Sequence, residues 1–376
     1  MVQLRNIFVM AILMLFAINA YSQSSMIEGC YTYLEKNGQS PEKYVISKFE
    51  QYDYVFLGEY HRNTQDVALV TALIPDLYKN GIRTIAYEFY EYTNQEIVDS
   101  LLTAEAWNEE FLYHQLSKGP GIIWGYSEYL DFFQRVWEFN QTLTQNQVNF
   151  RIILLGAEFN PCKEIPFEYD PEALMADIIE KEVIAKKEKV LIYCGIHHAF
   201  TTYRQPNYDF AQGKLINSDN GRFGNIIHEK YPEQTFTIFL HSPWVSDKGW
   251  DKQQVKPVNG VIDSVMAMLD NVPMGFDVKN TIFGSLTAND TYYAFGYDDF
   301  KLENFCDGYI FLLPYKKVKF VSIAPNFYDE YNLNKAKEFM RCRGMADEQL
   351  QMLTKEILIE MATETAEENY GDLMKE

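Results

Sequence analysis

Cysteine is scarce in this chain, and the absence of closely spaced cysteines argues against two classes of protein. The 376 residues hold five cysteines and no C-x-x-C pair. A zinc ribbon and a dense disulfide framework both need closely spaced cysteines, so neither is indicated. In an oxidising compartment one pair could bridge, and the odd count leaves at least one thiol free. The cysteines are Cys30, Cys162, Cys194, Cys306 and Cys342.

Several catalytic signatures are also missing. No G-x-S-x-G element is present, which argues against the serine nucleophile of an α/β-hydrolase. Neither a P-loop nor a G-x-G-x-x-G fingerprint occurs, so a nucleotide phosphate site is not indicated. The zinc-protease motif H-E-x-x-H is absent as well. Any chemistry must therefore come from residues that the fold brings together.

Positive charge is in short supply. Lys and Arg number 33 against 53 Asp and Glu, giving a formal net charge of −20. Nucleic acids and anionic membrane surfaces both demand a basic face, so we expect neither as a partner. A small-molecule or peptide substrate remains compatible with this surface.

The N-terminus has the features of a secretory signal peptide. Residues 7–17 are almost unbroken apolar sequence, and Ala20-Tyr21-Ser22 has the small-x-small spacing of a cleavage site. We predict cleavage before Gln23 and export to the periplasm or the outside of the cell. No later stretch approaches a membrane span. The predicted organisation is a signal peptide (1–22), an α/β domain (23–328) and a helical C-terminal extension (329–376).

Short apolar runs alternate with helical patterns through most of the chain. Such alternation predicts an α/β fold with a mostly parallel central sheet flanked by helices. Helices are expected between the runs, for example over 63–80, where apolar residues recur at helical spacing. The expected strands are Tyr54–Leu57, Thr84–Glu88, Arg151–Gly156, Val190–Cys194, Thr235–Leu240 and Gly308–Leu313.

Ionisable residues gather where these strands end. Glu59 and His61 follow the first strand two positions apart, so they would point to the same side if the chain stays extended. Four of the six histidines fall at such ends. Because open α/β sheets bind ligands at the carboxyl ends of their strands, we predict a site there. Its leading members are Glu59, His61, Glu88 and His198, with Glu158, His197 and His241 in second rank.

Three kinds of chemistry fit these residues. His61, oriented by Glu59 or Glu88, could take a proton from water that attacks an ester or amide, with His198 as substrate orienter or proton donor. Alternatively, Glu59, His61, Glu88 and His198 could supply the ligands of a divalent metal such as zinc. Haem binding without turnover is the third, with a His or a nearby Tyr on the iron. Those tyrosines are Tyr60, Tyr87, Tyr90 and Tyr203.

The motifs resemble a superfamily that joins the ChaN haem-binding proteins, the Tiki metalloproteases and the erythromycin esterases. Leu57-Gly-Glu-Tyr-His61 resembles the G-E-x-H of ChaN-like proteins, and Ala86-Tyr-Glu-Phe89 is similar to their next conserved stretch, continued by Gln95, Asp99, Trp124 and Tyr129. Gly195-Ile-His-His198 resembles the second G-x-x-H of Tiki-like members. Arg151 to Glu158 resembles the erythromycin esterases, whose first motif is one residue longer.

This resemblance covers residues 54–200 and implies a ChaN/erythromycin-esterase-like fold. It implies either a hydrolase that uses the Glu/His cluster, with or without a divalent metal, or a haem- or iron-binding protein of the cell envelope.

Overall fold

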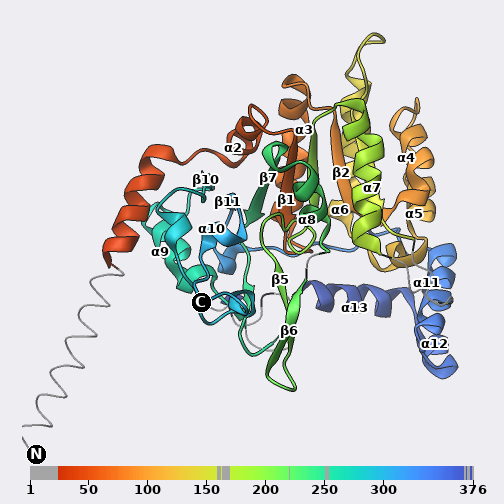
Figure 1. The fold of residues 1–376 in the computed structure, drawn as a ribbon. Coiled ribbons are helices and arrows are strands. Elements are labelled where there is room, and N and C mark those ends of the chain that lie inside the picture. The colour runs from red at the N-terminus through yellow and green to blue at the C-terminus, as the bar shows by residue number, and fades with distance from the viewer. Residues whose placement is uncertain are drawn as a thin grey trace, which may run out of the picture.

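The computed structural model describes residues 24–158, 162, 170–219, 221–249, 254–367, 370 and 373–374. It confirms the α/β fold: seven strands form one sheet in the order β10-β11-β7-β1-β4-β2-β3 (Figure 1). All neighbours pair in parallel except β10 and β11, which are antiparallel. The strands are β1 (Tyr54–Glu59), β2 (Thr84–Glu91), β3 (Arg151–Gly156), β4 (Val190–Gly195), β7 (Thr235–Leu240), β10 (Met274–Asp277) and β11 (Gly308–Phe311).

Helices cover both faces of this sheet (Figure 1). One helix occupies residues 24–37. The others are α2 (Pro41–Lys48), α3 (Thr64–Lys79), α4 (Gln95–Leu102), α5 (Glu109–Leu116), α6 (Ser127–Gln141), α7 (Pro171–Glu182), α8 (Phe223–Lys230), α9 (Val261–Met268), α10 (Leu302–Phe305), α11 (Glu330–Cys342), α12 (Asp347–Met352) and α13 (Lys355–Glu367). Two small hairpins, β5 (Gln205–Asp209) with β6 (Lys214–Asp219) and β8 (Trp244–Val245) with β9 (Gln254–Val255), lie outside the main sheet.

The apolar runs are continuous because each central strand is buried on both faces. In β1, Val55 and Leu57 belong to one hydrophobic core, whereas Tyr54 and Phe56 belong to a second core. Successive side chains of a strand point to opposite faces, so one four-residue run supplies both layers.

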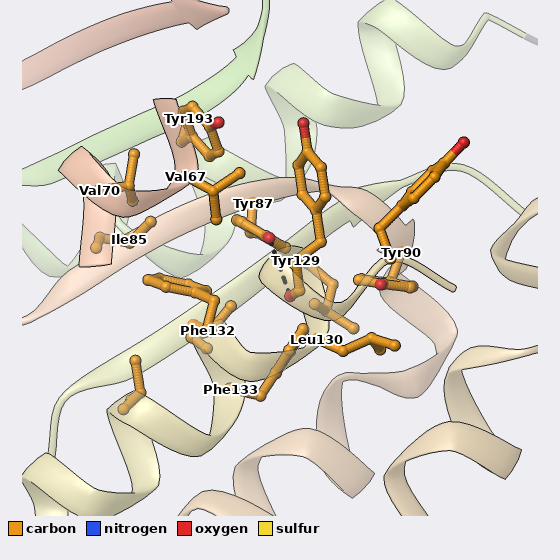
Figure 2. Packing of buried hydrophobic residues seen from close by; sticks show 14 of the residues in the cluster. Val67, Val70, Ile85, Tyr87, Tyr90, Tyr129, Leu130, Phe132, Phe133 and Tyr193 are labelled. Atoms are coloured by element: carbon orange, nitrogen blue, oxygen red, sulfur yellow. Dashed lines mark hydrogen bonds between the residues drawn. The ribbon is translucent and has the colours of Figure 1, made fainter. Parts of the chain in front are cut away.

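The first core contains an aromatic cluster to which β2 and α6 both contribute (Figure 2). The ring of Tyr87 on β2 stacks on Phe132 of α6, with centroids 4.9 Å apart and an interplanar angle of 20°. Its hydroxyl donates to the backbone carbonyl of Tyr129 at 3.1 Å. Figure 2 shows this bond and the buried position of Tyr129. The packing therefore fixes α6 against β2 and, with it, the position of Tyr129.

Helix α3 connects β1 to the next strand along the chain. The Asn63 side chain caps it by accepting from the Gln65 amide at 3.1 Å. The helix ends before Gly81, whose φ of +85° suits the left-handed turn. Its buried face carries Val67, Val70, Leu73, Ile74 and Leu77.

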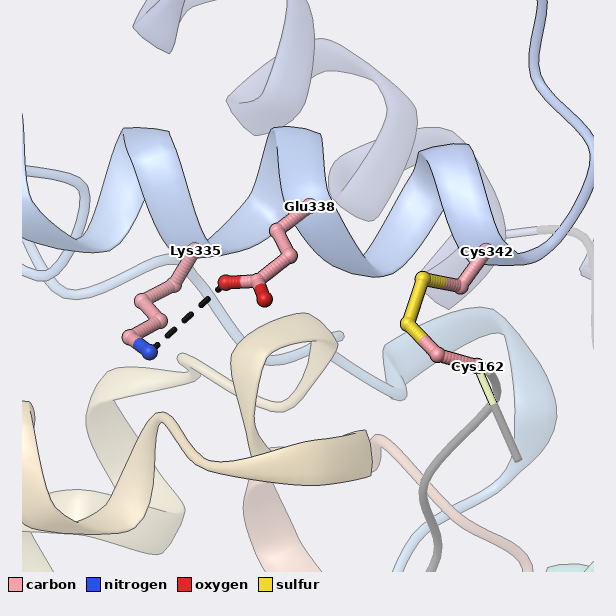
Figure 3. The surroundings of a disulfide bond; sticks show 4 residues. All are labelled: Cys162, Lys335, Glu338 and Cys342. Carbon is pink, nitrogen blue, oxygen red and sulfur yellow. Dashed lines mark ion pairs between the residues drawn. A yellow bond between two sulfur atoms is a disulfide. The ribbon is translucent and has the colours of Figure 1, made fainter.

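The C-terminal helices pack into the same molecule instead of standing apart. Phe339 of α11 and Leu358 of α13 are buried in the first core. A disulfide joins Cys342, the last residue of α11, to Cys162 (Figure 3). The remaining cysteines, Cys30, Cys194 and Cys306, are buried free thiols.

Two details differ from the sequence-based expectations. Strand β2 continues past Glu88 to Glu91 through an irregularity in its pairing with β3. The hairpin β5–β6 was not expected, because its strands are mostly polar. The described part of residues 329–376, where a helical extension was predicted, contains α11, α12 and α13.

Within the described part of the chain, no helix is long and apolar enough to cross a membrane. The predicted signal peptide lies outside the described residues.

Candidate functional site

Glu59, the last residue of β1, is buried at the carboxyl edge of the sheet, with 1% of its surface exposed. Its Oε1 accepts a hydrogen bond from the Tyr129 hydroxyl at 2.6 Å, and its Oε2 accepts one from the Tyr193 hydroxyl. The Tyr129 oxygen also accepts from the Arg62 amide, so its own proton is directed at Glu59. Burial raises the pKa of Glu59, while His61 and Tyr129 oppose that shift.

His61 is held by this carboxylate. Its Nδ1 lies 2.7 Å from Glu59 Oε1. An Nδ1–H that donates to Glu59 places the basic lone pair of the neutral imidazole on Nε2. Phe89 and Trp124 pack edge-on against the ring, with centroids 5.5 and 5.4 Å from that of the imidazole. The side chain is 31% exposed, so Glu59 orients a ring that is partly accessible to solvent.

Gly195 allows the close approach that this arrangement requires. A Cβ at that position would lie 2.6 Å from Cε1 and 2.7 Å from Nε2 of His61. Gly195 pairs with Glu59 across β4 and β1, and its amide donates to Glu88 Oε2 at 2.5 Å. The two histidine–carboxylate pairs of the site therefore meet at Gly195.

The second pair is Glu88 with His198. Glu88 Oε1 lies 3.1 Å from His198 Nε2, and the other ring nitrogen lies 2.8 Å from Glu172 Oε2. With a carboxylate at each nitrogen, both nitrogens must carry hydrogen, so the imidazole is a cation. Burial lowers the pKa of His198, but the two carboxylates outweigh it and raise the pKa to about 10. Burial likewise raises the pKa of Glu88, but His198 outweighs it and lowers the pKa to about 2.

Glu172 lies in the first turn of α7 and was not predicted from the sequence. Its Oε1 accepts from Arg222 at 2.9 Å, and its Oε2 accepts from the Phe223 amide at 2.8 Å. This network fixes the carboxylate that holds His198. Its sequence position after Pro171 is that of an ordinary helix start, so no motif distinguished it.

Tyr193 was also missed, because its place in the site depends on how β4 pairs with β1. It lies two residues before Gly195 on β4, opposite Leu57, as Gly195 lies opposite Glu59. Residues two apart on a strand share a face, so Tyr193 belongs to the same face as Glu59 once the β1–β4 register is known.

Two clefts open beside His61. The first has a volume of about 270 Å³ and is lined by His61, Glu88, His198 and an apolar wall that includes Phe89 and Trp124. These two rings stack at 5.4 Å and 11°. The second cleft, of about 210 Å³, lies over Glu59, Tyr60, Arg62 and residues 195–198, and it also includes His61. Both clefts are lined by His61 and His198.

The other predicted site residues, His197, Glu158 and His241, belong to neither of the two histidine–carboxylate pairs. His197 lines the second cleft, where it contacts the Tyr293 hydroxyl at 2.9 Å, and burial lowers its pKa to about 3. Glu158 is exposed. His241 is buried beside Tyr309 and Asp263 and lines neither cleft.

Comparison with known proteins confirms the resemblance inferred from the motifs. Residues 45–144 match the family described as "Haem-binding uptake, Tiki superfamily, ChaN". That segment contains Glu59, His61 and Glu88 and ends before His198. No curated protein matches the sequence.

Three solved structures align with parts of this chain. A succinoglycan biosynthesis protein aligns with a TM-score of 0.52 and 12% identity, over 80% of this chain and 99% of its own, and shows a common fold. An erythromycin esterase variant in its open conformation aligns at 0.46 and 9% identity, over 71% and 91%. ChaN of Campylobacter jejuni, described with cofacial haem, aligns at 0.27 and 15% identity, over 55% and 88%.

Proposed function

We propose that this protein is an exported hydrolase in which His61 activates water for attack on an ester, without need of a metal. The observation that carries the proposal is the Glu59–His61 pair: a buried carboxylate on Nδ1 and an imidazole that opens onto two clefts. A carboxylate in this position sets the tautomer and stabilises the imidazolium that forms when Nε2 takes a proton.

In this reaction His61 acts first as a general base and then as a general acid. Nε2 of His61 takes a proton from water as the water oxygen bonds to the ester carbonyl carbon. When the tetrahedral intermediate collapses, the carbon–oxygen bond to the alcohol breaks and His61 returns the proton to the departing alkoxide. The hydroxyls of Tyr129 and Tyr193 both donate to Glu59 and so favour its ionised form, against the burial that raises its pKa.

His198 then has a positioning role. Its two nitrogens are engaged by Glu88 and Glu172, and a pKa of about 10 makes it a poor proton donor at neutral pH. Its charge holds Glu88 against the Gly195 amide, beside the His61 ring. This differs from the orienting or proton-donating role that the sequence suggested.

Export is part of the proposal. The signal-like N-terminus and the Cys162–Cys342 disulfide support it, since structural disulfides are typical of oxidising compartments.

Haem binding is the second candidate, favoured by the description of the matched family and by the aromatic wall of the first cleft. Three of the four candidate tyrosines are poor ligands, because their rings are buried and their hydroxyls donate to backbone carbonyls; they are Tyr87, Tyr90 and Tyr203, of which Tyr90 lines the first cleft. His61 and Tyr60 line a cleft and could hold iron. The residues therefore fit haem through one of these two side chains.

A divalent metal fits the four predicted residues less well. They form two separate histidine–carboxylate pairs, and a protonated His198 offers no lone pair to a metal.

The test is hydrolysis of a panel of aryl esters and erythromycin by the mature protein. His61→Gln should lower kcat/KM by about 10² to 10⁴, and His228→Gln on α8, which lines neither cleft, is the matched control with unchanged activity. Activity should survive a chelator. Full activity in His61→Gln would overturn the proposal. A Soret band on adding haem, lost in His61→Gln and unaccompanied by hydrolysis, would support the second candidate.

A further inference from the structure

A second group of metal-binding side chains lies on the surface where α5 meets α11, and it involves none of the residues of the clefts. Glu110, His114 and Asp329 each present one ligand atom, and these atoms all lie within 4.8 Å of one another. Among the residues that the structure describes, this is the one set of three His, Cys, Asp or Glu side chains with that spacing.

The local structure explains why the three side chains converge. Glu110 and His114 are four residues apart on α5, so they share one face of the helix. Asp329 is the N-cap of α11: its Oδ1 accepts from the Asn332 amide at 2.8 Å. The capping bond commits one carboxylate oxygen to the helix and leaves Oδ2 directed at His114 Nε2, 2.5 Å away.

Neighbouring contacts hold this geometry in place. The ring of Tyr331 packs against His114 with centroids 4.5 Å apart. The buried side chain of Asn332 donates to the Phe327 carbonyl at 2.7 Å and to the Tyr113 carbonyl at 3.5 Å, joining the start of α11 to α5. His114 and Asp329 are therefore partly buried and held in place, whereas Glu110 on the same helix as His114 is exposed.

We propose that Glu110, His114 and Asp329 form a binding site for a divalent cation of the zinc type. One imidazole nitrogen and two carboxylate oxygens are ligands that Zn²⁺ accepts, with water in the fourth position. The ion would replace the proton between His114 and Asp329. These two atoms would then move apart to roughly 3.4 Å, the ligand spacing of a tetrahedral zinc site. Glu110 would turn inward to complete the set.

Such an ion would fasten α11, the first helix of the C-terminal region, to the body of the protein. The disulfide holds the other end of the same helix at Cys342 (Figure 3). Glu110 and His114 lie on α5, just before the segment 119–123 that supplies Gly121 to the wall of the first cleft.

The experiment is Zn²⁺ titration of the chelator-treated full chain by calorimetry, with bound zinc counted by elemental analysis. We expect one equivalent of zinc. His114→Gln and Asp329→Asn should each weaken binding at least about tenfold. Asn at position 329 still caps a helix, so that variant separates ligand loss from unfolding. Glu110→Gln should weaken binding, and Glu109→Gln, an exposed neighbour on α5, should not.

Two results would overturn the proposal. One is zinc binding that persists unchanged in both His114→Gln and Asp329→Asn. The other is the absence of saturable binding up to about 1 mM, which would leave less than about 4 kcal/mol of affinity. Loss of zinc in His61→Gln with retention in His114→Gln would place the ion in the clefts and would equally contradict it.

Discussion

Replacing Glu88 by Gln should destabilise the protein in a way that depends on pH, because Glu88 is one of two carboxylates that keep His198 charged. The pKa of His198 is raised from 6.5 to about 10. That change corresponds to about 5 kcal/mol in favour of the charged imidazole. Glu88 and Glu172 share this stabilisation, so loss of the Glu88 charge should cost about 2 to 3 kcal/mol of unfolding free energy. The side chains of Glu88 and His198 are mostly buried, at 17% and 24% exposure, so solvent screens their interaction only modestly.

The pH dependence follows from the two pKa shifts of the pair. Below pH 6.5 the imidazole is charged in the folded and unfolded chain alike, so the raised pKa stabilises the fold in full. This contribution declines above pH 6.5 and is gone once the pH passes about 10. Glu88 sets the acid limit: its contribution is present above pH 4.5 and is lost as the pH falls towards 2. The effect of Glu88→Gln should therefore be largest between pH 4.5 and 6.5.

Urea unfolding followed by tryptophan fluorescence, at pH 5.5 and at several values up to 10, measures this difference. Glu96→Gln is the matched control, since it removes the same charge from an exposed position on α4 and should change stability by less than about 0.5 kcal/mol. A ¹⁵N titration of the histidines gives a second readout. Equal stability of the two variants at pH 5.5, or a wild-type His198 that titrates near 6.5, would refute the reasoning.

Two further predictions concern Gly195 and the disulfide. Gly195→Ala places a methyl group within 2.7 Å of the His61 ring, so kcat/KM should fall more than tenfold and stability by about 1 to 3 kcal/mol. Ester hydrolysis and thermal unfolding measure the two effects, and full activity would contradict the prediction. Reducing Cys162–Cys342, which spans 180 residues of sequence, should cost about 2 to 5 kcal/mol in urea unfolding. The reductant should have no effect on a Cys162→Ser/Cys342→Ser variant, and an unchanged wild-type midpoint would show that the bridge contributes nothing.

The sequence by itself determined the type of fold, because buried parallel strands leave a clear local pattern. The run Tyr54–Leu57 is apolar throughout, since its alternate residues fill two different cores. The same local logic placed Glu59 and His61 on one side of the strand end, where they now form a pair. Helix α3 was predictable for similar reasons, from its apolar spacing and its Asn63 and Gly81 ends. Each of these features depends on neighbours in sequence.

Tertiary structure alone decided how the strand ends combine. Because β4 lies between β1 and β2, Gly195 lies where the Glu59–His61 pair and the Glu88–His198 pair meet. The strand order is set by packing of the whole sheet, and no short segment encodes it. The sequence predicted that Glu59, His61, Glu88 and His198 share one site, and the fold arranges them as two histidine–carboxylate pairs with different surroundings.

The carboxylates that pair with His198 and His114 could not be predicted from the sequence either. Glu172 reaches His198 from α7, and Asp329 reaches His114 across 215 positions of the chain. A carboxylate in the first turn of a helix looks the same in sequence whether it faces water or an imidazole. Only the packing of that helix against its neighbour decides which, because hydrogen bonds of this kind form within about 3 Å and depend on every contact that positions the two backbones.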